Sequence, residues 1–94
     1  MKFEWDQNKN QTNLQKHGIA FENVTPLFEG LVPLLVEYDD KEDYGEERWI
    51  GIGFLRNHVI VVVFTEPTPG TTRIISARKA DQNERQKYFN TFRN

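Results

Sequence analysis

Four β-rich runs with short connections constrain the fold of this chain more than any other feature of its sequence. The runs cover residues 32–38, 48–55, 59–65 and 72–78. The connection at Arg56-Asn57 leaves room only for a hairpin turn, so consecutive runs are expected to pair antiparallel. Residues 59–63 are all valine or isoleucine, and this uninterrupted apolar run predicts the most buried and central strand.

A helix is predicted over residues 7–17, ahead of these strands. Asp6 is placed to cap its first turn, and Gly18 is placed to end it in a left-handed conformation. Leu14 is its one aliphatic residue, so the helix is expected on the surface. Residues 3–5, which precede it, alternate apolar and polar side chains like a short strand.

Two more helices are expected. Apolar residues follow a helical spacing over residues 21–28. Pro26 removes a backbone donor there, so the start of this helix stays open, and Thr25 can instead cap a shorter turn with Pro26 at its first position. The last helix is expected to begin after Asp81, because Asp81 and Glu84 have the spacing of a capping box.

These elements predict one α+β domain spanning residues 1–94 in the order β-α-α-β-β-β-β-α. The sheet is expected to be small, four-stranded and antiparallel, with the helices covering one of its faces. Gly51 and Gly53 lie within one strand and leave space for a close neighbour, either the helix at residues 7–17 or a partner chain. A chain of 94 residues is long enough to bury one modest core.

Composition removes several classes of function. The chain has no cysteine and only two histidines, which excludes a disulfide framework and argues against any metal centre or other cofactor. Its net charge is −2, so it does not coat nucleic acid through bulk positive charge, and any phosphate site has to be local. Residues 59–64 are the longest apolar stretch and fall well short of the ~20 residues that cross a bilayer, so a cytoplasmic location is expected.

One candidate site lies on the first predicted helix. Lys9, Asn13, Lys16 and His17 are spaced so that they share roughly one helical face. Histidine suits proton transfer near neutral pH, and lysine ammonium groups suit a phosphate. The alternative is that the lysines form a solvated face and that His17 interacts with the helix dipole.

A second candidate site lies on the last strand. Strict alternation would put Ile74, Ser76 and Arg78 on one face and Arg73, Ile75 and Ala77 on the other. Arg78 is suited to hold a phosphate bidentately, or else to pair with Glu46 or Glu47. Arg48 leaves the same choice open between a phosphate clamp and a salt bridge.

Short motifs extend along nearly the whole chain. They are Phe3-Glu4-Trp5-Asp6, Lys9, Asn13, Lys16-His17-Gly18-Ile19, Phe21, GEERWIGIG at residues 45–53, RIISARKA at residues 73–80, Glu84-Arg85 and Tyr88. Together they resemble the successive motifs of BrnT proteins, the ribonuclease toxins of bacterial type II toxin-antitoxin systems. The resemblance implies a RelE-like fold, RNA cleavage without a metal, and a hetero-oligomer with a BrnA-like, DNA-binding antitoxin.

The leading hypothesis from the sequence is therefore a metal-independent endoribonuclease. It assigns catalysis to His17, Glu47, Arg48 and Arg78, and it assigns RNA binding to Lys9, Asn13, Lys16, Arg73, Lys79, Arg85 and Tyr88. The alternative is a non-catalytic or inactivated module that only binds an antitoxin. Under both readings the acidic segment at residues 37–43 is expected to attract a basic partner.

Overall fold

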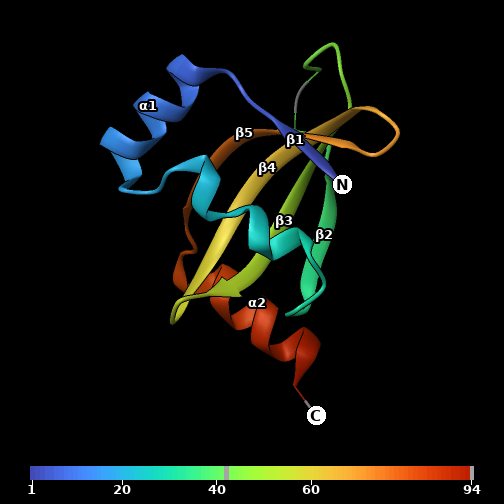
Figure 1. Ribbon diagram of the computed structural model, residues 1–94. Helices are drawn as coiled ribbons and strands as arrows, with labels where there is room; N and C mark the ends of the chain where they lie inside the picture. The colour runs from blue at the N-terminus through green and yellow to red at the C-terminus, as the bar shows by residue number, and fades with distance from the viewer. Residues whose placement is uncertain (42, 94) are drawn as a thin grey trace.

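The fold is a twisted five-stranded sheet with helices on both faces and at one edge, seen in a computed structural model that describes residues 1–41 and 43–93 (Figure 1). The strand order is β1-β5-β4-β3-β2. In chain order the elements are β1 (Lys2–Glu4), α1 (Gln7–His17), the 3₁₀ helices η1 (Phe21–Asn23) and η2 (Thr25–Phe28), β2 (Leu34–Asp39), β3 (Arg48–Leu55), β4 (His58–Thr68), β5 (Thr71–Lys79) and α2 (Gln82–Phe92).

Strand β4 is central, as its apolar run predicts. Its residues alternate between two clusters, with Ile60 and Val62 in one and Val59 and Val61 in the other, and each of these four side chains is at most 4% exposed. Both faces of the strand are thus buried, which explains why its sequence does not alternate with polar residues. The antiparallel pairing of β2 to β5 is also confirmed.

The prediction of a purely antiparallel, four-stranded RelE-like sheet was wrong at one edge. Strand β1 joins the sheet as a fifth strand, parallel to β5, with Lys2 opposite Thr71. A parallel pair needs a long crossover, and the two strands here come from opposite ends of the chain. No short connection in the sequence therefore signals this pairing.

Helix α1 has the predicted bounds and caps. The Asp6 carboxylate accepts hydrogen bonds from the backbone amides of Asn8 and Lys9, and Gly18 ends the helix at φ +72°. The helix lies beside β5 rather than over the sheet (Figure 1). Its polar sequence fits this edge position, since only a narrow face of the helix is covered.

The contact between α1 and β5 is made by an asparagine instead of an apolar stripe. The Asn13 side chain donates from Nδ2 to the Ala77 carbonyl at 2.8 Å, and its Oδ1 accepts from the Ala77 amide at 3.1 Å. Strand β1 pairs with only three residues of β5, and the carboxamide supplies hydrogen-bond partners for backbone groups at the same edge farther along the strand. Nδ2 also donates to the Ile19 carbonyl, so Asn13, 6% exposed, is fully engaged.

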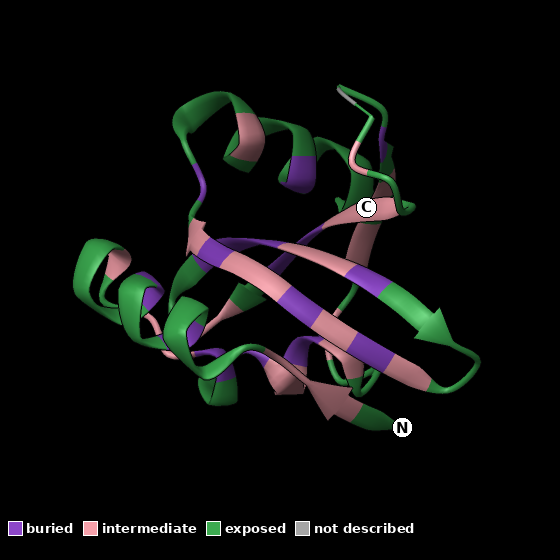
Figure 2. Ribbon diagram, turned by 90° about the horizontal axis from the view of Figure 1, so that it is seen from above, coloured by how far each residue is buried: buried purple, intermediate pink, exposed green. Residues whose placement is uncertain are grey.

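The expected helix at residues 21–28 is instead the two short helices η1 and η2. A short helix with Pro26 in its first turn is formed, as the alternative anticipated, but Thr25 is the first residue of η2 and Val24, not Thr25, is its N-cap. Phe21, Val24 and Leu27 pack on one sheet face, whereas α2 places Tyr88 against the other (Figure 2). Coverage of a single face was therefore also a wrong expectation.

Gly53 admits η2 rather than α1 or a partner chain. A methyl group at this position would lie 2.7 Å from Leu27 Cδ2 and 3.2 Å from Leu34 Cδ1. At Gly51 the closest atom, on the Phe64 ring, would be 3.3 Å away. The glycines thus let the apolar side chains of η2 and β2 approach the middle of β3 closely.

A β-bulge in β5 changes which side chains share a face. Val63 pairs with Ser76 and Phe64 pairs with Ile74, so Ile75 is an extra residue in the ladder. Ile74 and Ala77 consequently enter the same core cluster. The strict alternation expected from the sequence, with these two residues on opposite faces, was wrong.

No helix formed by residues 1–41 and 43–93 is long and apolar enough to span a membrane.

Replacing Asn13 by alanine should destabilise the fold. The change leaves the amide and carbonyl of Ala77 and the carbonyl of Ile19 without their partner, and each buried unpaired group costs about 1–3 kcal/mol. Urea unfolding should therefore show a loss of at least about 2 kcal/mol. Asn8→Ala, the same change at an exposed position of α1, is the control. An Asn13→Ala midpoint equal to that of the control would contradict the role assigned to this side chain.

Candidate nucleic-acid interface

A groove of about 330 Å³ lies between α1 and the bulged part of β5. It is called the α1–β5 groove below, and its lining consists of Asn8, Lys9, Thr12, Asn13, Lys16, His17, Ile75 and Ser76. The four polar residues predicted to share one face of the first helix all line it. Opposite them lie Ile75 and Ser76, which the bulge positions and which no signal in the sequence assigns to the groove.

The groove carries positive charge that no acidic side chain neutralises. Lys9 and Lys16 are exposed, and neither forms an ion pair with any residue in the described part of the chain. His17 is half-buried at the C-terminal end of α1. Two ammonium groups and an imidazole around a hydroxyl-bearing wall form a site that suits a phosphate and a proton transfer.

Asn13 has a structural role in this groove rather than a free binding function. Both hydrogens of its Nδ2 are used by backbone carbonyls of Ile19 and Ala77. Its place in the lining is therefore that of a fixed wall, which sets the distance between α1 and β5.

The arginines of the second predicted constellation are each occupied by glutamate. Arg48 pairs with Glu46 at 3.3 Å, and its guanidinium carbon lies 3.9 Å from the centre of the Tyr44 ring. Arg73 pairs with Glu4 at 2.7 Å and approaches Glu46 at 3.9 Å. Both guanidinium groups are thus held in salt bridges, which is the alternative that the sequence left open for Arg48.

Arg78 forms a bidentate pair with Glu84 at the start of α2, not with Glu46 or Glu47. The two nitrogen-oxygen distances are 2.8 and 2.7 Å. The hydrogen bond from Arg78 lowers the pKa of the Glu84 carboxyl, against the opposing effect of burial, and the pKa of Arg78 is raised in return. The two guanidinium nitrogens that were expected to bind a phosphate instead bind the carboxylate of Glu84.

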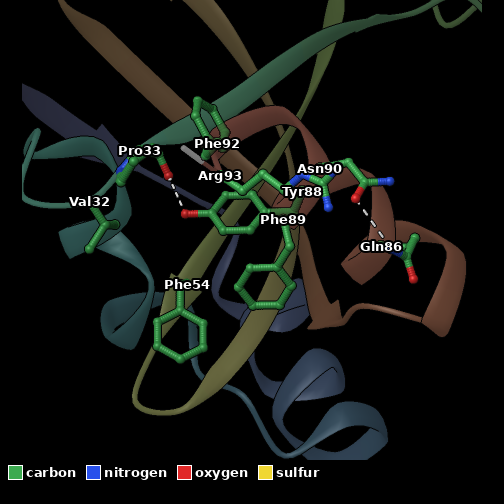
Figure 3. A pocket seen from close by; sticks show the side chains of 9 residues that line it. All are labelled: Val32, Pro33, Phe54, Gln86, Tyr88, Phe89, Asn90, Phe92 and Arg93. Carbon is green, nitrogen blue, oxygen red and sulfur yellow. Dashed lines mark hydrogen bonds between the residues drawn. The ribbon is translucent and has the colours of Figure 1, made fainter.

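The remaining predicted residues lie away from the α1–β5 groove. Tyr88 is buried, and its hydroxyl donates to the Pro33 carbonyl at 2.8 Å (Figure 3). Arg85 donates to the Ala80 carbonyl, and Lys79 is exposed at the end of β5. Glu47 is exposed, and its backbone carbonyl accepts from the Thr65 hydroxyl. The structure thus brings together Lys9, Asn13, Lys16 and His17 but leaves the other seven predicted residues outside this groove.

A second hollow is larger and mostly apolar. It has a volume of about 420 Å³ and lies between α2 and the neighbouring ends of β2 and β3 (Figure 3). Phe54, Phe89 and Phe92 line it together with Tyr88, and its few polar groups do not converge. Its lining shares no residue with the α1–β5 groove. Within residues 1–41 and 43–93, no group of three His, Asp or Glu side chains is placed to hold a metal ion.

Comparison with known proteins identifies the family. The family model of the ribonuclease toxin BrnT of type II toxin-antitoxin systems matches residues 5–84. The chain belongs to the BrnT family. The match includes α1, strands β2 to β5 and the start of α2 but none of β1, so the α1–β5 groove lies within the matched residues.

A solved BrnT protein has the same fold. The crystal structure of the Brucella abortus ribonuclease toxin BrnT is 31% identical in sequence and matches with a TM-score of 0.66. The likeness covers 87% of this chain and 99% of the other. A comparison with curated proteins found no match.

The Arg78–Glu84 pair should make the stability of this BrnT protein depend on pH. Because the pKa of Glu84 is lowered in the folded protein, its contribution is complete above the ordinary glutamate pKa of about 4.3 and is lost as the pH falls through the folded value. Glu84→Gln keeps a side chain that can complete the capping box but removes the charge. Both partners are partly exposed, so we expect a loss of about 1 kcal/mol at neutral pH.

Urea unfolding of both proteins between neutral pH and pH 3 measures this effect. The two unfolding curves should approach each other as the pH falls below about 4.3. Glu66→Gln, which alters an exposed carboxylate with no ion pair to a described residue, is the control. A Glu84→Gln deficit that stays constant down to pH 3 would contradict the charge-based account.

Proposed function

We propose that this chain is a metal-independent endoribonuclease that binds the scissile phosphate of RNA in the α1–β5 groove. The observation that carries the proposal is the convergence of Lys9, Lys16 and His17 on this one groove. Membership of the ribonuclease toxin family supports RNA as the substrate. The unpaired ammonium groups supply local positive charge in a chain whose net charge is negative.

The proposed reaction is attack of an RNA 2′-hydroxyl on the adjacent phosphorus. His17 accepts the 2′-hydroxyl proton as the new oxygen-phosphorus bond forms, and the bond to the 5′-oxygen breaks. Lys9 and Lys16 stabilise the extra negative charge on the phosphate oxygens, and one of these ammonium groups protonates the leaving oxygen. Glu47, Arg48 and Arg78 are not needed in this scheme, because they lie outside the groove and both arginines already have glutamate partners.

We also propose that a BrnA-like antitoxin neutralises the chain in a hetero-oligomer. Support comes from the family, whose members are toxins of type II toxin-antitoxin systems. Part of the acidic segment is exposed, as expected of a surface that attracts a basic partner. Asp40 and Asp43 are exposed, whereas Asp39 is buried, and Glu42 lies outside the described residues. Beside it Tyr38, which is 50% exposed, packs edge-to-face with Trp49, adding an aromatic anchor.

His17→Ala should reduce RNA cleavage by about 10²–10⁴-fold, the usual contribution of general acid-base catalysis. Purified protein is incubated with total RNA in the presence of a chelator, and cleavage is followed by the appearance of new RNA ends. Gln15→Ala changes an exposed residue of α1 outside the groove and is the matched control. Addition of the antitoxin should stop cleavage by the wild type.

Three results would count against the proposal. Loss of activity in chelator that magnesium restores would contradict metal independence. Full activity of a folded His17→Ala variant would remove His17 from catalysis. Binding of the antitoxin by a wild-type chain that does not cleave RNA would favour the non-catalytic binding module instead.

A further inference from the structure

The second region of unneutralised positive charge lies at the β3–β4 hairpin. Arg56, His58 and Lys79 are exposed there, and none of them forms an ion pair within the described part of the chain. The nearest acidic residue along the chain, Asp81, is occupied in capping α2. This contrasts with Arg48, Arg73 and Arg78, which all pair with glutamate.

Two hollows border this region, and one of them begins directly beside the α1–β5 groove. The first, called the hairpin hollow, has a volume of about 260 Å³ and extends from Gly18 and Ile19, directly after His17, to Arg56, His58 and Lys79. The second, called the aromatic hollow, has a volume of about 320 Å³ and shares His58 and Lys79 with the first. The three depressions therefore follow one another around the C-terminal end of α1 and along the end of the sheet.

The aromatic hollow ends at two exposed phenylalanines. Phe54 and Phe89 are 37% and 48% exposed, and their ring centres are 6.1 Å apart (Figure 3). Exposed aromatic rings beside cations are the surface that unpaired nucleotide bases stack on, because every base has an apolar face. An acidic peptide would use the cations but would gain little from these rings.

The hairpin itself has an unusual residue at its turn. Arg56 and Asn57 form the two-residue connection with φ of +50° and +70°, the left-handed region. Asparagine and glycine favour this conformation, whereas arginine adopts it against the preference of its Cβ atom. Backbone strain of this kind clusters at functional sites, so the strained Arg56 is a candidate binding position.

We propose that the hairpin and aromatic hollows bind the nucleotides adjacent to the scissile phosphate, so that a single strand of RNA runs from the α1–β5 groove past Gly18 to Phe54 and Phe89. Arg56 and Lys79 hold its phosphates, and the two rings stack on its bases. This inference rests on the proposed function, because it extends the same RNA site. It also gives a role to Lys79, which lies outside the α1–β5 groove.

Binding of single-stranded 2′-O-methyl RNA, which lacks the attacking hydroxyl, tests the proposal without interference from cleavage. Fluorescence anisotropy is measured across a salt series for strands of increasing length. Arg56→Asn and Lys79→Gln should each reduce the slope of log affinity against log salt by about 0.7, the value for one lost phosphate contact with a single strand. Lys2→Gln, at the opposite end of the sheet, is the matched control and should keep the wild-type slope (Figure 1).

Two further variants separate binding from folding. Arg56→Asn should raise the urea midpoint, because asparagine relieves the left-handed turn, even as it weakens RNA binding. Phe89→Leu should weaken binding of long strands by about tenfold at an unchanged salt slope, since it removes a stacking ring but no charge. Strands too short to reach beyond the α1–β5 groove should not distinguish any of these variants from the wild type.

The outcomes distinguish this inference from the proposed function. If Arg56→Asn and Lys79→Gln bind RNA with the wild-type affinity and salt slope, the extended path is contradicted. If cleavage still depends on His17, the proposed catalytic site is unaffected by that result. A wild-type chain that binds no RNA would overturn both. Variants that bind RNA normally but lose the antitoxin would show that the hairpin region is a protein interface, which also contradicts the inference.

Discussion

The arrangement of the site depends on the hydrogen bonds between the Asn13 carboxamide and the backbone of Ala77. Helix α1 has almost no apolar face, so packing alone would hold it weakly against the sheet. The amide instead takes the place of a neighbouring strand at the edge of β5. Asn10 adds a second attachment, because its side chain accepts from the Phe21 amide and donates to Glu22. With the helix fixed in this way, the side chains of Lys9, Lys16 and His17 are held beside the bulge of β5.

The distribution of ion pairs separates structural cations from available ones. Arg48, Arg73 and Arg78 lie in strands of the sheet and form ion pairs with glutamates. These pairs hold the arginine side chains in place, so the arginines are not free to bind a phosphate. The cations of α1 and of the β3–β4 hairpin have no such partners among the described residues. In a chain with a net charge of −2, the unpaired cations of α1 and of the hairpin therefore supply local positive charge along one edge and one end of the sheet.

Local signals in the sequence predicted local structure well. The caps at Asp6 and Gly18, the capping box before α2 and the valine-rich run of β4 gave elements close to those observed. Interactions between distant segments were not predictable in the same way. Neither the parallel pairing of β1 with β5 nor the extra residue at Ile75 has a pattern in the sequence, because both depend on the register of the assembled sheet. The helical face of Lys9, Lys16 and His17 followed from spacing alone, whereas the glutamate partners of the arginines required the fold.

Binding of RNA in the groove between α1 and β5 would account for the position of the unpaired cations of α1. The most direct measurement is a two-dimensional NMR titration of isotope-labelled protein with a single-stranded 2′-O-methyl RNA. We expect the backbone amide signals of Lys9, Lys16, His17 and Ser76 to shift together and to saturate at one RNA concentration. Shifts confined to the outer edge of β2, around Val36 and Tyr38, with the amides of α1 unchanged, would contradict it.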